Sequence, residues 1–197
     1  MRIRDPHKEK AIREQALKMI VREGFEGLSM HKLAKAAGVS ASTIYIYFKD
    51  RDDLILKLYA EKMGRMSDAS LAGFDPAMPF DEGLKVQWIN RARHFLKHPL
   101  EMHFLEQIRF SPFHDQGLKS LDPRFLESMR AFCKHAIRRG ELVKMPVEVY
   151  WSVAYAPLYQ LVKYHIHGKG LPGTEDFVLD DKLLLQTLKL VLKALKP

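Results

Sequence analysis

Hydroxyl and cationic side chains gather in the run SASTIYIYFKDR, which covers residues 40–51. Side chains of these types form hydrogen bonds with phosphate oxygens and with the edges of nucleic-acid bases. The members of the run that are expected to do so are Ser42, Thr43, Tyr45, Tyr47, Lys49 and Arg51. Ile44 and Phe48 stand four residues apart among them, so they share one side of a helix and are expected to be core. The run therefore predicts a surface that contacts a nucleic acid.

Two short helices joined by a tight turn are predicted to carry these side chains. Apolar residues recur at helical spacing between Ser29 and Leu54, so one face of each helix can pack on the other. Gly38 falls where the first of the two helices must end, and glycine tolerates the left-handed backbone of a sharp turn. Ser40 is placed to cap the next helix through its hydroxyl. Two helices with such a turn have the sequence form of a helix-turn-helix.

The leading end of the second of these helices is expected to reach the base edges. A recognition helix lies close to the floor of the groove, which favours short side chains there. Ala41 and Ser42 meet this requirement, and Thr43, one position further round, is expected to reach a phosphate. Tyr45 and Tyr47 are too bulky to be buried together in so small a domain, so the Tyr47 phenol is predicted to lie on the sugar-phosphate backbone.

Positive charge is densest near the start of the chain. The formal net charge is +8, and residues 1–50 contain ten Lys or Arg against six Asp or Glu. Lys49 and Arg51 lie beyond the end of the recognition helix and are expected to neutralise phosphate. A solvated, Lys-rich helix face would produce the same surplus, so charge alone leaves both interpretations open.

The rest of the sequence predicts an all-α protein of about nine helices. The first helix is expected from about His7 to Glu23 and is ended by Gly24, while Ser29 and Ser40 cap the next two. Asp50 or Asp52 is expected to start a fourth helix that reaches about Ser70. Gly and Pro concentrate at residues 72–82, which predicts a boundary between two parts. The later helices are expected at 81–97, 99–110, 122–139, 146–167 and 177–195.

Cysteine content and hydropathy indicate the compartment. Cys133 is the single cysteine, which excludes an intramolecular disulfide and is typical of a reducing compartment. The charged start MRIRDPHKEK lacks the apolar stretch of a secretion signal. No uninterrupted apolar run approaches the roughly 20 residues that a membrane span needs. We therefore expect a soluble, cytoplasmic protein that has no contact with a membrane.

The segments ALKMIVREGFEGLSMHKLAKAAGVS and GVSASTIYIYFKDRDDL together resemble the N-terminal domain of the TetR family of transcriptional regulators. The resemblance covers about the first 60 residues, and Arg51 stands where the family commonly has Lys. It implies a DNA-binding domain at residues 1–52 and a helical effector-binding and dimerisation domain at 53–197. It further implies that Ser29 and His31 stand at the start of the helix that contacts the DNA backbone and an adjacent base. Ala41, Ser42 and Ile46 are implied to face the major groove. Those implied to contact phosphates are Thr43, Tyr45, Tyr47 and Arg51.

A homodimer is expected from the same resemblance, because one reading module buries little surface and two modules can read a palindromic operator. The last two helices are the candidates for the interface, since both carry many apolar residues. These are Trp151, Val153, Ala154, Leu158 and Leu161, followed by Phe177, Leu184, Leu188, Val191 and Leu195. Such a helix pair can also be intramolecular core, and the sequence leaves this alternative open.

Aromatic residues between 88 and 160 are dense enough to line an effector pocket, although any all-α core also needs large residues at this spacing. The resemblance implies a small molecule that changes the spacing of the DNA-reading heads. The protein is therefore expected to be a repressor that its effector releases from DNA. The preferred lining residues are Phe95, Phe104, Phe132, Tyr155 and Tyr159, with His103 and His135 as polar candidates. Arg91, Arg93 and Lys97 favour an anionic effector in one interpretation, but we expect them to form a solvated basic face.

Other function classes fit the sequence less well. Cys133 and His135 lie two residues apart, on different helix faces, so they form no catalytic dyad. His94 and His98 have a helical metal-site spacing, but no further ligand is placed beside them. We expect no enzyme activity, no cofactor and no metal. A DNA-binding regulator or architectural protein without small-molecule control remains the main alternative, and a helical enzyme is the less favoured one.

Overall fold

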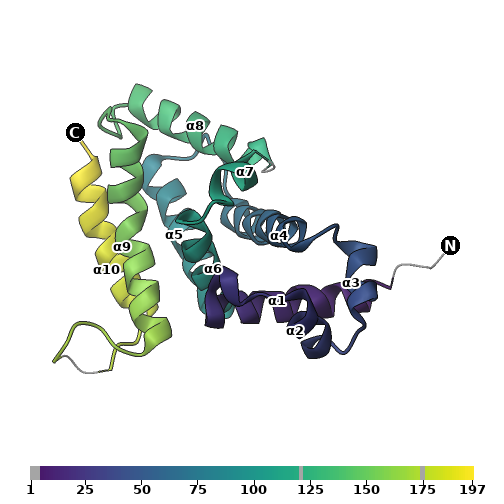
Figure 1. The fold of residues 1–197 in the computed structure, drawn as a ribbon. Coiled ribbons are helices and arrows are strands. Elements are labelled where there is room, and N and C mark those ends of the chain that lie inside the picture. Colours follow the sequence, from purple (N-terminus) through teal and green to yellow (C-terminus); the bar gives the residue numbers. More distant parts are fainter. Residues whose placement is uncertain (1–4, 120–121, 174–175) are drawn as a thin grey trace. The chain divides into compact units, whose positions relative to one another are not determined.

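The computed structural model describes residues 5–119, 122–173 and 176–197, and within these ranges the chain forms ten α-helices (Figure 1). They are α1 (Pro6–Gly27), α2 (Met30–Ala36), α3 (Ala41–Tyr47), α4 (Arg51–Leu71), α5 (Phe80–Lys97), α6 (Pro99–Arg109), α7 (His114–Leu118), α8 (Pro123–Arg138), α9 (Val147–His167) and α10 (Asp181–Leu195). An isolated antiparallel bridge joins Lys169 to Asp176. The prediction of an all-α fold is confirmed. None of the described helices is both long and apolar enough to cross a membrane.

The chain folds as two compact units. The first unit contains residues 5–65 and 98–119, and the second contains residues 66–97, 122–173 and 176–197. Helix α4 begins in the first unit, and its last turn, from Met66 onward, belongs to the second.

Local signals fix the first helix of the first unit. The Asp5 side chain accepts a hydrogen bond of 2.9 Å from the His7 amide, and Pro6 occupies the first turn, where its missing N–H is not needed. The backbone leaves helical geometry at Gly24, whose φ is +73°. The prediction that Gly24 ends the first regular helix is confirmed, and a short continuation reaches Gly27.

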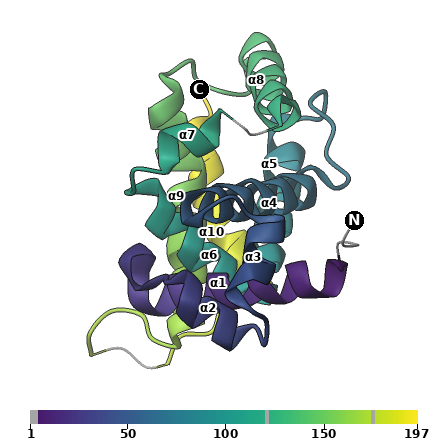
Figure 2. The same cartoon turned by 45° about the vertical axis from the view of Figure 1, so that its right-hand side comes forward.

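Helices α1, α2 and α3 gather with the start of α4 around one apolar core (Figure 2). The fully enclosed members of this core include Ile12, Ile20, Leu33, Ile44, Phe48 and Leu54. The predicted burial of Ile44 and Phe48 is therefore confirmed. Helix α6 packs against α1 in the same unit and adds Phe104 and Ile108 to this core.

Helix α7 is a difference from the prediction, because residues 114–118 were not expected to be helical. Its sequence HDQGL is too short to display a helical period, so no pattern identifies it. Tertiary packing holds it in place: a Cβ added at Gly117 would lie 2.0 Å from the ring of Tyr59 on α4. The glycine is what permits this close approach.

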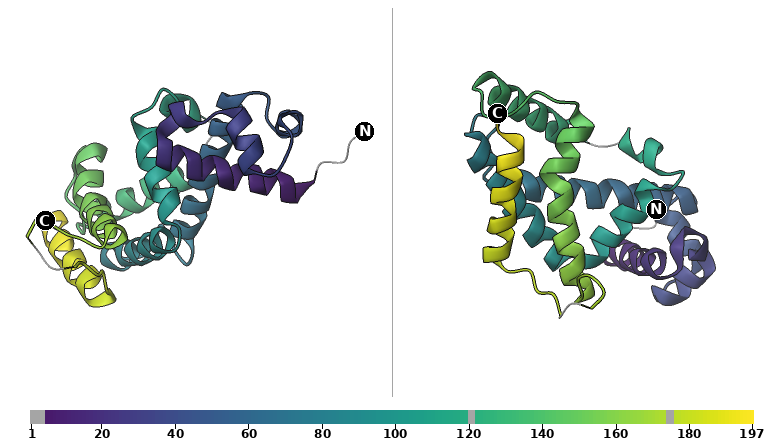
Figure 3. Two further views of the ribbon diagram at one scale, coloured as in Figure 1. Left: turned by 60° about the horizontal axis from the view of Figure 1, so that its bottom comes forward. Right: turned by 90° about the vertical axis from the view of Figure 1, so that its left-hand side faces the viewer.

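The second unit is built from α5, α8, α9 and α10. Helices α9 and α10 lie side by side, and both pack on α5 (Figure 3). The Trp88 indole on α5 donates a hydrogen bond of 2.8 Å to the backbone carbonyl of Ala154 on α9. Helix α8 approaches α5 closely at Gly83, where an added Cβ would lie 2.4 Å from the Phe132 ring.

Several apolar residues of the last two helices pack inside the second unit. Ala154 and Leu158 of α9 and Leu184, Leu188 and Val191 of α10 are all buried. The intramolecular alternative left open by the sequence therefore holds for these residues. Val149 on α9 and Leu190 on α10 remain exposed, at 47% and 66% of their accessible surface.

Candidate nucleic-acid interface

The leading end of α3 is organised by a cluster of three hydroxyls. The Ser40 oxygen accepts a hydrogen bond of 3.2 Å from the Thr43 amide, which confirms Ser40 as the N-cap. The same oxygen lies 2.8 Å from the hydroxyls of both Ser42 and Thr43. The preceding Gly38 has φ of +65°, as a sharp turn between α2 and α3 requires. The cap therefore holds the first turn of α3 rigidly.

The two faces of α3 differ sharply. Ile44 and Phe48 have no accessible surface, so they anchor the helix in the core of the first unit. Ser42 is exposed, as is 54% of Tyr45, while Ile46 is partly exposed. On α2, His31 is exposed and Ser29 partly exposed; Ser29 occupies the N-cap position but makes no side-chain capping bond. A polar, accessible face on an anchored short helix can approach base edges and phosphates.

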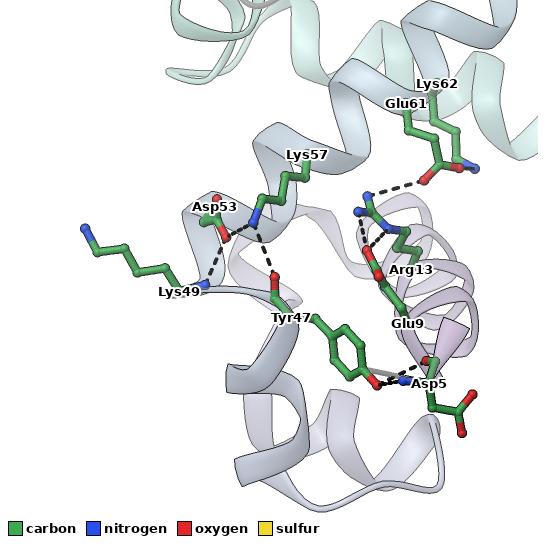
Figure 4. A network of polar contacts seen from close by, with 9 residues as sticks. All are labelled: Asp5, Glu9, Arg13, Tyr47, Lys49, Asp53, Lys57, Glu61 and Lys62. Carbon is green, nitrogen blue, oxygen red and sulfur yellow. Dashed lines mark hydrogen bonds and ion pairs between the residues drawn. The ribbon is translucent and has the colours of Figure 1, made fainter. Parts of the chain in front are cut away.

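Tyr47 lies on the inner side of α3, with only 8% of its surface accessible. Its phenol oxygen accepts a hydrogen bond of 2.8 Å from the Asp5 amide, and its hydroxyl lies 3.1 Å from the Asp5 carbonyl (Figure 4). The tyrosine thus holds the start of α1 against the end of α3. Phosphate contact by its hydroxyl stays a prediction, and in this arrangement the hydroxyl is already shared with the main chain.

The Arg51 guanidinium is also engaged within the protein. It donates a 3.1 Å hydrogen bond from Nε to the Leu28 carbonyl and another hydrogen bond from Nη2 to the Phe25 carbonyl. Both carbonyls lie at the end of α1, so this side chain joins the end of α1 to the start of α4. Contact of Arg51 with phosphate stays a prediction.

Lys49 projects away from this framework, whereas its backbone is fixed (Figure 4). Its amide donates a hydrogen bond of 2.9 Å to the Asp53 carboxylate, which also lies 2.8 Å from the Lys57 ammonium. The Asp50 carboxylate accepts from the Asp53 amide at 2.8 Å, so Asp50 caps α4 as one of the two predicted caps. Partial burial raises the pKa of Asp53, but hydrogen bonds from Lys57 and the Lys49 amide outweigh it and hold the pKa below its usual range.

Sequence reasoning missed a chain of alternating charges that crosses α1, α4 and α6. The Arg13 guanidinium lies 2.7 Å from Glu9 and 3.3 Å from Glu61 (Figure 4). The Lys62 ammonium lies 2.7 Å from Glu61 and 3.5 Å from Glu101, and Arg65 lies 2.8 Å from Glu101. We call these six residues the charge chain. The spacing of Glu9 and Arg13, four residues apart, was a local signal of it in the sequence.

The residues predicted to bind an effector are divided between the two units. His103 and Phe104 belong to the first unit, where Phe104 has no accessible surface and packs 6.4 Å from the Phe25 ring. The other candidates, Phe95, Phe132, His135, Tyr155 and Tyr159, belong to the second unit.

Within the second unit these candidates form two groups. The Tyr159 ring lies 5.9 Å from Phe95 and 6.5 Å from Tyr155. Phe132 instead stacks on Phe80 at 5.5 Å, and the His135 Nδ1 atom lies 3.0 Å from the Pro76 carbonyl. In the first group, Tyr155 and Tyr159 lie beside the guanidinium of Arg91. Burial raises the pKa of Tyr155 to about 12. Participation of these residues in effector binding stays a prediction.

The basic residues of α5 do not form one solvated face. Arg93 and Lys97 are exposed as predicted, but the prediction is wrong for Arg91, whose side chain has no accessible surface. The reason is helical position: Arg91 shares the inward face of α5 with Leu84, Trp88 and Phe95.

Comparison with known proteins identifies the family. The family model described as bacterial regulatory proteins, tetR family, matches residues 12–58. A Haemophilus influenzae protein described as an uncharacterized HTH-type transcriptional regulator is 32% identical over 133 residues, which cover 67% of this chain and 69% of that protein.

Solved structures have the same fold. A TetR family transcription regulator from Marinobacter aquaeolei VT8 superposes with a TM-score of 0.76 at 25% identity, over 100% of this chain and 99% of that one. The transcriptional regulator FadR from Bacillus subtilis, in complex with stearoyl-CoA, superposes with a TM-score of 0.71 at 20% identity, over 95% and 99% of the two chains. The chain described here belongs to the TetR family and is a DNA-binding transcriptional regulator with an N-terminal helix-turn-helix.

Proposed function

We propose that this regulator is a homodimeric repressor, which binds a palindromic operator through α3 and leaves it when a small-molecule effector binds. The observation that carries the proposal is the two-sided character of α3. Ile44 and Phe48 anchor the helix completely, while Ser42 and Tyr45 stay accessible on its outer side. A helix held in this way keeps its polar tip at a fixed position, which direct reading of base edges requires.

The proposed contacts divide into those that read the sequence and those that hold the duplex. His31, Ala41, Ser42 and Ile46 read base edges. Phosphates are held by Ser29, Thr43, Tyr45 and Lys49. For Tyr47 and Arg51 we propose a different primary role, because their polar ends already bind the main chain of α1. They position α3 and α4, and either can share its donors with a phosphate.

A dimer through α9 and α10 follows from the size of the reading module. A single module covers roughly 600–1,000 Å², and two modules on a two-fold axis gain affinity by effective concentration. Each helix has a second, outward stripe at helical spacing that supports this interface. The two stripes are Val149, Val153, Ala156 and Gln160 on α9, and Leu183, Thr187, Leu190 and Ala194 on α10.

Repression and release are proposed from mechanism and from one relative. A protein that occupies a promoter excludes polymerase by default. The FadR structure of B. subtilis contains stearoyl-CoA, which supports a small-molecule effector for this chain as well. An effector releases DNA only if it binds the DNA-incompatible arrangement more tightly than the compatible one.

Selection of DNA sequences from a random library, followed by titrations at several salt concentrations, tests the DNA-binding part. We expect a palindromic consensus and an affinity that falls steeply with salt. Lys49→Ala should reduce the salt slope by about 1, whereas Lys189→Ala on the exposed side of α10 is the matched control and should not change it. Ser42→Ala and His31→Ala should change the preferred sequence instead.

Oligomeric state and effector response test the rest. A Leu190→Glu variant should shift the protein from dimer to monomer in sedimentation and should lose operator affinity with it. A strict monomer that binds its operator tightly would contradict the dimer proposal. A native mass measurement after gentle purification should detect a co-purified effector. An architectural protein would instead bind DNA equally with and without any small molecule.

A further inference from the structure

A buried guanidinium occupies the centre of the second unit. Arg91 on α5 has no accessible surface, and its Nε donates a hydrogen bond of 3.2 Å to the Gln87 side-chain oxygen. Its Nη1 donates to the Tyr159 hydroxyl at 2.6 Å and lies 3.6 Å from the Met66 sulfur. Side chains of three helices, α4, α5 and α9, therefore converge on one positive charge.

Aromatic rings enclose this charge. The guanidinium carbon lies 4.5 Å from the centre of the Tyr155 ring, 5.2 Å from Phe125 and 5.3 Å from Trp151. Aromatic faces attract a cation through their quadrupole. They carry no net charge, however, so they reduce the penalty of burying the guanidinium without neutralising it.

The charge has no acidic partner within the part of the chain that the structure describes. The buried polar and charged residues of the described second unit are Ser70, Gln87, Arg91 and His94, and none of them is acidic. Moreover, the buried Nη2 atom of Arg91 has no hydrogen-bond partner among the described residues. Guanidinium donors that are fully buried are ordinarily hydrogen-bonded, so an open donor here indicates a missing acceptor.

A second donor stands beside the open one. The Tyr159 hydroxyl accepts from Arg91 Nη1, which leaves its own proton able to point elsewhere. Nη2 and this hydroxyl together offer two donors to the two oxygens of one carboxylate. Guanidinium groups bind carboxylates strongly in this manner, because the hydrogen bonds are assisted by charge.

We infer that Arg91 and Tyr159 bind the carboxylate of a monoanionic, otherwise apolar effector, whose body lies among the aromatic residues of α5, α8 and α9. The inference rests on the proposed effector response. One buried cation matches one negative charge, and the other basic residues of this helix, Arg93 and Lys97, are exposed. Phe95 and Trp151 supply apolar surface next to the two donors.

Binding of defined probes to the full-length protein tests the inference without DNA. Both tryptophans, Trp88 and Trp151, belong to the second unit, so intrinsic fluorescence reports on this site directly. The probes are octanoate and phenylacetate, each compared with its neutral amide. We expect each acid to bind at least about tenfold more tightly than its amide, as expected for charge-assisted hydrogen bonds.

Substitutions then assign the preference to the two donors. Arg91→Met keeps much of the side-chain volume, and it should abolish the preference for the acid over the amide. Tyr159→Phe removes one donor and should weaken octanoate binding by about threefold to tenfold. Arg93→Met, two residues away on the exposed side of α5, is the matched control and should retain the full preference. Circular dichroism verifies that each variant is folded.

The inference is overturned if wild-type protein binds the acids no better than the amides, or if Arg91→Met keeps the preference. It is also overturned if octanoyl-CoA binds whereas octanoate does not. Should Arg91→Met fail to fold, the wild-type selectivity and Tyr159→Phe still decide the question. Operator binding by wild-type protein without any probe is measured separately, so a failure of DNA recognition is distinguished from a failure of carboxylate binding.

Discussion

Each of the two units buries a cation, and their surroundings differ. In the first unit Lys62 is 5% exposed and lies between the carboxylates of Glu61 and Glu101, within the charge chain. In the second unit Arg91 is fully buried among aromatic rings and neutral acceptors. The charge chain contains three acidic and three basic residues, so the first unit balances its own buried charge. The second unit leaves its charge open to a partner from outside.

This difference agrees with the functions that we propose for the two units. A DNA-reading unit needs a rigid framework, and buried charges that are paired with opposite charges help to make a framework rigid. A unit that responds to a ligand needs an interaction that is incomplete until the ligand arrives. We therefore expect substitutions of the two buried charge sites to act on stability in opposite directions.

The largest effect is expected from Glu101→Gln. The variant removes the carboxylate that Lys62 and Arg65 share, and breaking a buried ion pair costs about 3–5 kcal/mol. Glu61 remains beside Lys62, so we expect a loss of about 2–3 kcal/mol in the free energy of unfolding. Urea denaturation measures it, with the exposed Glu82→Gln on α5 as the control. A loss no larger than that of the control would show that the charge chain contributes little.

Arg51→Ala should have the next largest effect. This side chain satisfies the carbonyls of Leu28 and Phe25 at the end of α1, and hydrogen bonds to charged groups contribute about 1.5–3 kcal/mol. We expect a loss of about 2 kcal/mol in urea denaturation, accompanied by weaker binding to every DNA sequence. Arg51→Lys should not restore stability, because one ammonium cannot reproduce the planar fork that reaches both carbonyls. Full rescue by lysine would contradict the positioning role.

Arg91→Met should change stability in the opposite direction. The substitution removes a buried charge that has no acidic partner, and replacing buried charges by apolar groups of similar volume is often neutral or stabilising. The lost ring contacts and two hydrogen bonds offset part of the gain, so we expect a rise of about 1 kcal/mol in the free energy of unfolding. The same denaturation experiment checks it. A fall of more than about 2 kcal/mol would mean that Arg91 is a structural element of the core.

Helix caps, a helix break and one buried arginine show which features can be predicted from the sequence. The caps Ser40 and Asp50 and the break at Gly24 depend on neighbouring residues, so local pattern was enough to predict them. Helical spacing also places position 91 on the same face as Trp88 and Phe95, although the basic side chain led to the opposite prediction.

Tertiary neighbours, in contrast, leave no trace in local pattern. Periodicity identifies the apolar face of the helix that carries Phe104. It does not indicate that α1 packs on this face. In the same way nothing near Tyr47 in the sequence indicates that its hydroxyl would meet Asp5, 42 residues earlier. Contacts of this kind come from the packing of helices that are distant in the chain.

The smallest effect is expected from Asp53→Asn, which tests a more accessible ion pair of the first unit against the buried one. The Asp53 pKa is lowered in the folded protein, so its carboxylate contributes stability above the pKa of the unfolded chain, near 4. This contribution is lost as the pH falls through the folded pKa. The Asp53 side chain is 27% exposed and its partner Lys57 is 46% exposed, so solvent screens the pair.

We therefore expect Asp53→Asn to be about 0.5–1 kcal/mol less stable than wild type at neutral pH, and the difference to shrink as the pH falls through the lowered pKa of Asp53. Urea denaturation at pH 7 and at pH 2.5 measures both values, with the exposed Glu127→Gln on α8 as the control. Asparagine still accepts the Lys49 amide, so the start of α4 should stay in place. A difference that persists unchanged in acid would mean that Asp53 acts through its shape and hydrogen bonding, because a charge effect must disappear once the carboxylate is protonated.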